Sequence, residues 1–292
     1  MENQIPVSIV VLSYNHENFI ERCLYSATNQ TFTNFEIIYI DNNSLDRTYE
    51  RGLKVLQDSG VKFYSEKTKT NLGISKGFNY ALKNAKGYFI STLAGDDWWD
   101  VENLKVKLDY ASKHTEYGMI YGNGYAYDDE SQEISLFYKK PSVHGSIFRE
   151  LLKAPNINPQ GILYNHTLIK SLGFFDENGK VEDRDLWLRI AQIAKIGYVH
   201  KALTFYRVNH GNNISSNIDY MRSGNEYFFE KYEKEYPNEV REARIKQYQF
   251  FAYTLAEKMP GWESLRFMMK NYKFDYIYNR QILKCIIKML NK

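Results

Sequence analysis

The stretch Gly87-Tyr-Phe-Ile-Ser-Thr-Leu-Ala-Gly-Asp-Asp97 is a short apolar run that ends in two adjacent carboxylates, Asp96 and Asp97. A strand that delivers both carboxylates to a sheet edge builds a compact oxygen-ligand site for a hard divalent ion such as Mg²⁺ or Mn²⁺. The same pair could instead cap a helix, because a helical pattern begins at Asp100. This stretch alone leaves both alternatives open.

Strand and helix patterns alternate on either side of this stretch, through roughly the first 115 residues. The expected strands are Val7–Ser13, Phe35–Ile40, Val61–Tyr64, Tyr88–Leu93 and Met119–Tyr127. One helix is expected where Ile20, Cys23, Leu24 and Ala27 recur at helical spacing. Three more are expected at 46–57, 74–84 and 101–114. This alternation predicts an α/β fold with a mainly parallel sheet and helices on both faces. Ligands of such sheets sit at the C-terminal strand ends, where Ser13, Asp41 and Asp96 fall.

The pattern changes after Asp128 and again after Asn217. The first change brings irregular sequence with short helices at 146–152 and 166–172, then a helix at 183–194 and a strand at 198–206. Beyond Asn217 only helices are expected, at 220–236, 238–258, 261–272 and 276–290. We therefore expect a domain over 1–217 and a C-terminal helical region over 218–292.

The composition is typical of a globular protein, with 43% hydrophobic and 25% charged residues among 292. A net charge of +3 is too small to indicate a nucleic-acid partner. The two cysteines, Cys23 and Cys285, lie far apart, which is typical of packing residues in a reducing compartment. Val7–Leu12 is too short for a signal sequence or a membrane span, so we expect a cytoplasmic protein.

Four segments, in order along the chain, resemble motifs of the inverting family 2 glycosyltransferases. They are Val10-Val-Leu-Ser-Tyr-Asn15, Ile40-Asp-Asn-Asn-Ser-Leu-Asp-Arg-Thr48, Asn71-Leu-Gly-Ile-Ser-Lys-Gly-Phe-Asn79 with Gly95-Asp-Asp97, and Val181-Glu-Asp-Arg-Asp-Leu-Trp-Leu-Arg189. The resemblance implies the GT-A fold and a role in bacterial surface polysaccharide or glycan biosynthesis. It also implies a nucleotide-sugar donor, a metal ion, and a glycan or lipid-linked acceptor.

The first two segments suit the base of a nucleotide-sugar donor. Ser13, Tyr14 and Asn15 offer backbone groups and an aromatic ring beside the base. Asp41 can accept the imide N–H of uracil, a group that cytosine lacks, so we expect a UDP-linked sugar. The alternative for Asp41 is a turn residue. We expect Ser44 and Asp46 to cap the following helix.

The third segment suits the diphosphate. Asn71 begins a loop before a helix, where backbone N–H groups and Lys76 can meet phosphate oxygens. Lys76 could equally be a solvated helix residue. By the resemblance, Asp96 binds near the ribose and Asp97 coordinates Mn²⁺ or Mg²⁺. Ala94 stands where the family's commonest motif has a further Asp, so the diphosphate is expected to supply much of the metal binding.

The fourth segment and the loop after it complete the expected site. The resemblance assigns Asp183 as the base that takes the acceptor's proton, with Glu182 and Asp185 as secondary candidates. Asp183 could instead cap a helix. The run Tyr206-Arg-Val-Asn-His-Gly-Asn-Asn-Ile-Ser215 resembles a loop that closes over the donor. His210 is expected there as a metal or phosphate ligand, and Arg207 as a partner of the diphosphate or of the neighbours of Asp183.

The last residues form a basic segment. Seven Lys or Arg residues and one acid, Asp275, lie between Arg266 and Lys292, and apolar residues share one helical face. Such a helix suits peripheral contact with an anionic membrane surface. The alternative is a helix that packs on the domain or on a second copy in a homodimer.

Other classes of protein fit less well. A dinucleotide oxidoreductase would carry a glycine-rich turn where this chain has Ser13-Tyr-Asn-His-Glu17. A glycoside hydrolase needs two carboxylates that flank one bond, which the strand order does not suggest. A nucleotidyltransferase would share the nucleotide half and release pyrophosphate. A nucleotide-sugar-binding or scaffold protein with impaired catalysis is a further alternative, motivated by Ala94.

Overall fold

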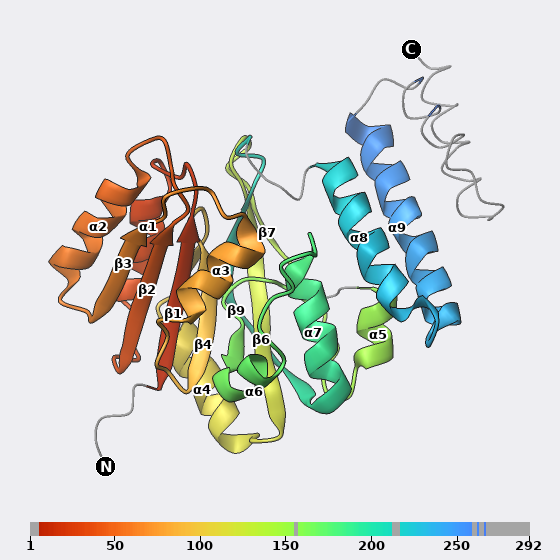
Figure 1. The fold of residues 1–292 in the computed structure, drawn as a ribbon, viewed down its shortest axis with the longest axis horizontal. Helices are drawn as coiled ribbons and strands as arrows, with labels where there is room; N and C mark the ends of the chain where they lie inside the picture. Colours follow the sequence, from red (N-terminus) through yellow and green to blue (C-terminus); the bar gives the residue numbers. More distant parts are fainter. Residues whose placement is uncertain (1–5, 155–156, 212–216, 259–261, 263–265, 267–292) are drawn as a thin grey trace. The chain divides into compact units, whose positions relative to one another are not determined.

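The computed structural model describes residues 6–154, 157–211, 217–258, 262 and 266 (Figure 1). These residues fall into two compact units. One lies within Met1–Leu151 and Pro155–Gly224, and the other within Leu152–Ala154 and Asn225–Lys292.

The first unit is built on a nine-stranded sheet whose first half is parallel. Strand β1 is central to this half, and all seven of its residues are buried. Both neighbours of β1 run parallel to it, with Ser13 paired with Asp41 and Leu12 paired with Ala94. The predicted strand ends therefore meet at one edge. The four strands are β1 (Val7–Ser13), β2 (Phe35–Asp41), β3 (Phe63–Lys67) and β4 (Phe89–Ala94).

The second half of the sheet mixes directions. The strand order is β3-β2-β1-β4-β8-β6-β9-β5, with β7 paired to β6. Strand β8 is antiparallel to β4 and β6, whereas β6 and β9 are parallel to each other. The expected sheet is confirmed, but β5, β7 and β8 were not predicted because two or three residues carry no periodicity. These strands are β5 (Trp98–Trp99), β6 (Tyr117–Asp128), β7 (Ile134–Leu136), β8 (Leu163–Asn165) and β9 (Lys195–Val208).

Helices cover this sheet, as Figure 1 shows for α3 in front of β1 and α1 behind it. The predicted apolar positions of α1 are confirmed: Ile20, Cys23, Leu24 and Ala27 are all buried in the core. Helix α3 packs so closely on β1 that a Cβ atom at Gly77 would lie 2.9 Å from Leu12. The helices are α1 (Ile20–Thr28), α2 (Thr48–Ser59), α3 (Ile74–Leu82), α4 (Asn103–Lys113), α5 (Phe148–Lys153), α6 (His166–Ser171) and α7 (Glu182–Ile193).

Two longer helices follow, α8 (Ile218–Glu233) and α9 (Pro237–Lys258), close to their expected bounds. In the second unit, aromatic side chains of α8 are buried, and Arg244 of α9 forms ion pairs with Glu226 and Glu233 of α8. The helices expected at 261–272 and 276–290, and with them most of the basic segment, lie outside the described residues. Within the described part of the chain, no helix is long and apolar enough to cross a membrane.

Candidate functional site

The C-terminal ends of β1 and β2 are joined by a buried hydrogen-bond network around Asp41. The Asp41 side chain is fully buried, and its carboxylate accepts bonds from Ser13 Oγ at 3.1 Å, Ser44 Oγ at 2.6 Å and Ser44 N at 2.8 Å. In this structure Asp41 therefore holds the two loops together.

The turn after β1 is braced by the same network. Asn15 has a positive φ of 56°, donates its N–H to Ser44 Oγ and accepts the N–H of Leu45 through Oδ1. Ser44 consequently does not cap α2, contrary to expectation, whereas Asp46 accepts the N–H of the first residue of α2. Tyr14 is 39% exposed, so its ring is open to a ligand.

Asn42 organises the loop before α3. Its Nδ2 group donates to Asn71 Oδ1 and to the Gly73 carbonyl, both at 3.1 Å, and its Oδ1 accepts the N–H of Leu72. Asn71 is exposed, and its Oδ1 also accepts the N–H of Gly73. Lys76 is exposed in the first turn of α3. The loop is thus shaped from within, and Lys76 is the cation that it presents.

Asp96 and Asp97 lie in the tight turn that follows β4. A Cβ atom at Gly95 would lie 2.7 Å from Ser13 Cβ, so glycine lets this turn pack against the end of β1. Asp97 Oδ1 accepts the backbone N–H of Arg207 at 2.7 Å, and its buried Oδ2 has no hydrogen-bond partner among the described residues. Neither carboxylate caps α4, whose N-cap residue is Glu102, so the capping alternative is wrong.

Two imidazoles flank Asp96. Its Oδ2 lies 3.0 Å from Nε2 of the buried His210 and 4.0 Å from Nε2 of His16. Burial alone would raise the pKa of Asp96, but the interactions with His210 and His16 outweigh it, and the pKa is lowered. Burial and the charge of Asp96 together raise the pKa of Asp97 well above its usual range. Burial lowers the pKa of His16.

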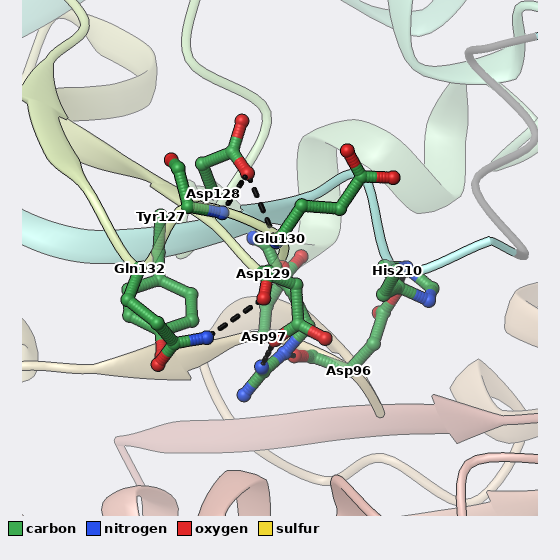
Figure 2. Close-up of polar contacts among 10 residues, drawn as sticks. Asp96, Asp97, Tyr127, Asp128, Asp129, Glu130, Gln132 and His210 are labelled. Carbon is green, nitrogen blue, oxygen red and sulfur yellow. Dashed lines mark hydrogen bonds and ion pairs between the residues drawn. The ribbon is translucent and has the colours of Figure 1, made fainter.

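Arg207 connects this turn to the β6–β7 turn, and Figure 2 shows Asp129 beside Asp97. The Arg207 side chain forms an ion pair with Asp129 and donates through Nε to the Asp96 carbonyl at 3.1 Å. Its guanidinium carbon lies within 4.6 to 5.1 Å of three ring centroids. In this structure the Arg207 guanidinium therefore forms an ion pair with Asp129, and the predicted pairing with the diphosphate or with the neighbours of Asp183 stays a prediction.

The residues around Asp97 fit a divalent cation that arrives with a ligand. Among the described residues, no group of three or more His, Cys, Asp or Glu side chains is arranged to hold a metal unaided. The orphaned Oδ2 atom of Asp97 and the adjacent Asp96 carboxylate nevertheless form an anionic oxygen pair. Mg²⁺ and similar ions bind through one or two carboxylates together with substrate phosphates. His210 faces Asp96 here, so its metal contact stays a prediction.

Asp183 lies in the first turn of α7, one residue after Glu182. The N-cap residue is Val181, so Asp183 is not the cap, although its Oδ1 accepts the N–H of Arg184 at 2.6 Å. Burial raises the pKa of Asp183, and burial with the charge of Asp183 raises the pKa of Glu182 to about 8. Two adjacent carboxyl groups that resist ionisation suit proton transfer near neutral pH.

Other side chains of this segment have structural contacts. Asp185 forms a 2.7 Å ion pair with Arg189, whose guanidinium also donates to two backbone carbonyls. Trp187 is buried, and its indole N–H donates to Tyr164 OH at 2.9 Å. We therefore place Trp187 in the core and regard Asp185 as a brace of α7.

Sequence reasoning missed two members of the site, His16 and Asp129. His16 directly follows the Ser13–Asn15 segment, so its position in that turn was the available signal. Asp129 pairs with a residue 78 positions away, and a single sequence gives no signal for such a pairing.

Residues 8–173 match the model of a protein family described as glycosyl transferase family 2. An uncharacterised glycosyltransferase of Rickettsia typhi is 30% identical over 70% of this chain and 64% of that protein. The chondroitin synthase of Escherichia coli is 29% identical over 72% of this chain and 30% of that protein. The hyaluronan synthase of Pasteurella multocida is 28% identical over 73% of this chain and 21% of that protein. The chain thus spans less than two thirds of each of these relatives.

Two solved structures share the fold. Residues 1–349 of Staphylococcus aureus TarS, in complex with UDP-GlcNAc, give a TM-score of 0.64 at 19% identity, over 98% of this chain and 81% of that chain. The mannosyltransferase PcManGT from Pyrobaculum calidifontis, in complex with GDP-Man and Mn²⁺, gives a TM-score of 0.65 at 14% identity. The match covers 97% of this chain and 86% of that chain. At these identities the likeness establishes the fold alone, and the predicted GT-A fold is confirmed.

Proposed function

We propose that this chain, which belongs to glycosyltransferase family 2, transfers a sugar from a UDP-linked donor to a hydroxyl group of a glycan or lipid-linked acceptor, with inversion at C1. One observation carries the proposal. At the end of β4 two carboxylates lie side by side, and the buried Oδ2 of Asp97 has no protein partner among the described residues. A cation bound to a nucleoside diphosphate is the partner that such a pair lacks.

The donor's nucleoside is assigned to the ends of β1 and β2. The exposed ring of Tyr14 can stack on a base, and its neighbours Ser13 and Asn15 are held in place by hydrogen bonds with Asp41 and Ser44. Lys76 and the Asn71 loop would face the diphosphate. We infer a uridine donor from Asp41 at the end of β2, whose carboxylate could accept the imide N–H of uracil; the solved structures of this fold hold UDP-GlcNAc in one case and GDP-Man in the other. Calorimetry should show UDP binding at least about tenfold tighter than GDP or ADP, a difference of about 1.4 kcal/mol.

Asp97, with Asp96 and His210 beside it, would hold Mn²⁺ or Mg²⁺ together with the donor's phosphate oxygens. When bound, the ion stabilises the negative charge that develops on the diphosphate leaving group. Asp96 would bind near the ribose, its orientation set by the close contact of its Oδ2 atom with His210 Nε2.

Asp183 would take the proton of the acceptor hydroxyl as its oxygen attacks C1 from the face opposite the diphosphate. Burial raises the pKa of this carboxyl group, which brings it closer to the pH at which a general base works best. Glu182 precedes it, and its own raised pKa keeps a second proton nearby. A single base with an in-line attack leaves no covalent intermediate, so the product is inverted.

A panel of nucleotide sugars tests this proposal. We expect a UDP-sugar to raise the thermal midpoint, more strongly with Mn²⁺ than with chelator, and then to release UDP when a hydroxyl acceptor is present. Release of pyrophosphate would instead identify a nucleotidyltransferase. Stabilisation without transfer to any acceptor would favour the binding or scaffold alternative.

The acceptor's location is a separate proposal. The basic segment at 266–292 would bring the enzyme to an anionic membrane surface that holds a lipid-linked acceptor. Deleting residues after Leu265 should then reduce co-sedimentation with anionic vesicles. Unchanged co-sedimentation would favour packing of this segment on the domain or on a second copy.

A further inference from the structure

The guanidinium of Arg207 is a buried positive charge beside the Asp96–Asp97 turn, and it forms an ion pair with a carboxylate. The residue is only 6% exposed, and the rings of Phe19, Trp98 and Tyr127 surround its guanidinium. Aromatic faces attract a cation but do not replace the hydrogen bonds that it loses on burial. A guanidinium in such a place needs a carboxylate, because an unpaired buried charge is strongly destabilising.

Asp129 supplies that carboxylate from outside the established motifs. It lies in the turn between β6 and β7, and its Oδ1 forms the ion pair with Arg207. Its backbone N–H also donates to the Val208 carbonyl at 3.0 Å. The turn thus binds β9 at two successive residues, Arg207 and Val208.

The residue before it extends this grip to the segment that carries His210. Asp128 accepts the N–H groups of Glu130 and Ser131 and so shapes the turn, as the dashed lines in Figure 2 show. The same carboxylate accepts Asn209 Nδ2 at 2.7 Å. Asn209 has a positive φ of 59°, and it directs the chain towards His210.

Other groups of Arg207 contact the turn that holds Asp96 and Asp97. Its backbone N–H donates to Asp97 Oδ1 and its Nε to the Asp96 carbonyl. One residue therefore links the β6–β7 turn to both carboxylate-bearing residues. A shift of Arg207 would change the orientation of Asp97 and, through the chain, the position of His210 against Asp96.

We propose that Asp129 is a positioning residue of the nucleotide-diphosphate site: by holding the guanidinium of Arg207, it fixes the Arg207 N–H on Asp97 and His210 against Asp96. This inference rests on the proposed function for its consequence, which is tight binding of UDP with Mn²⁺. The contacts that carry it lie entirely in the ligand-free protein.

The electrostatics favour the same role. The Arg207 guanidinium forms its ion pair with the Asp129 carboxylate, which neutralises its positive charge, while its Nε atom donates to the backbone carbonyl of Asp96. Without Asp129, an unneutralised guanidinium would lie beside the place that a divalent cation must enter. Like charges in a buried site repel more strongly than they do in water.

The test compares Asp129→Asn with Glu130→Gln, which removes a carboxylate one residue further along the same turn. Glu130 is exposed, and Figure 2 shows its carboxylate pointing away from Asp97. In nucleotide-free protein, hydrogen exchange over 207–210 should rise at least about tenfold in Asp129→Asn, the equivalent of about 1.4 kcal/mol of lost protection. It should stay at the wild-type level in Glu130→Gln. Asp129→Glu, which keeps the charge, should restore most of the protection.

Calorimetry with UDP and Mn²⁺ is the second readout. We expect Asp129→Asn to weaken UDP binding about tenfold and Glu130→Gln to leave it within about twofold. Unchanged hydrogen exchange in Asp129→Asn would overturn the inference, and so would raised exchange with wild-type UDP affinity. If the wild-type protein binds no UDP, the proposed function fails, and the exchange data still decide whether Asp129 holds the Arg207 segment.

Discussion

Two regions of the molecule differ in how their buried polar groups find hydrogen-bond partners. The first region is the loops after β1 and β2, and the second is the turn after β4 together with the first turn of α7. Around Asp41 every hydrogen bond described above runs to another protein group, from Ser13 and from Ser44. Asp97, in contrast, keeps one buried oxygen without a partner among the described residues, and burial raises the pKa of Asp97 and of Asp183. Polar groups that satisfy one another build a rigid surface. Buried carboxylates with raised pKa values are the candidates that we propose for meeting a ligand's charge or proton.

The largest effect is expected for sugar transfer when Asp183, in the first turn of α7, is substituted. Asp183→Asn keeps the shape of the side chain and can still accept the N–H of Arg184, but it can no longer take a proton. Transfer should fall roughly 10²–10⁴-fold while UDP affinity and the thermal midpoint stay near wild type. Initial rates of UDP release measure this. Near-normal turnover would assign the base to Glu182, and Glu182→Gln would then show the loss.

The next effect tests the β4 side. Asp97→Asn keeps an acceptor for the Arg207 N–H and removes a buried carboxylate whose pKa is raised by burial and by the charge of Asp96. UDP affinity in Mn²⁺ should fall at least about tenfold. In chelator, however, the thermal midpoint should be no lower than that of wild type, because repulsion by Asp96 is relieved. A variant that loses stability in chelator and keeps its UDP affinity would show that Asp97 is a structural residue.

A smaller effect is expected at Lys107, a buried charge outside the candidate site. Lys107 is fully buried, burial lowers its pKa to about 7, and its ammonium donates to Asn103 Oδ1 at 2.6 Å and to the Gly161 carbonyl. The unfolded chain holds this proton up to a pKa near 10.4, so between about pH 7 and 10 it binds more protons than the folded chain. Stability contributed by this site should therefore rise with pH across that window.

Lys107→Met isolates the contribution of this lysine. The difference in unfolding free energy between wild type and variant, measured by urea denaturation, should shift in favour of wild type as pH increases from about 7 to 10. Transfer activity at fixed pH should change little, since no site residue contacts Lys107 among the hydrogen bonds that the structure gives. A difference that does not vary with pH would mean that Lys107 keeps an ordinary pKa.

The sequence predicted the first region better than the second, for a physical reason. The β1 and β2 strands, the α1 spacing and the strand-end positions of Ser13 and Asp41 follow from local periodicity and from the parallel arrangement. Even there, Ser44 was expected to cap a helix and instead bonds to Asp41 and Asn15. A short polar side chain can satisfy either role, and only the tertiary structure decides between them.

The second region depends on contacts between distant segments. Arg207 meets Asp97 across 110 positions and Asp129 across 78, and a single sequence gives no signal for either pairing. The strands that bring them together include β5 and β7, of two and three residues. The resemblance supplied Asp97, Arg207 and His210 by motif, but the arrangement of charges around them required the fold.

The most direct test of the account follows one reaction by proton NMR, with the UDP-sugar found by the panel and a hydroxyl acceptor. We predict that UDP appears in step with a product whose anomeric configuration is opposite to that of the donor, and that Asp183→Asn binds UDP but gives neither signal within the same time. A product that retains the donor's configuration, or pyrophosphate in place of UDP, would contradict the account.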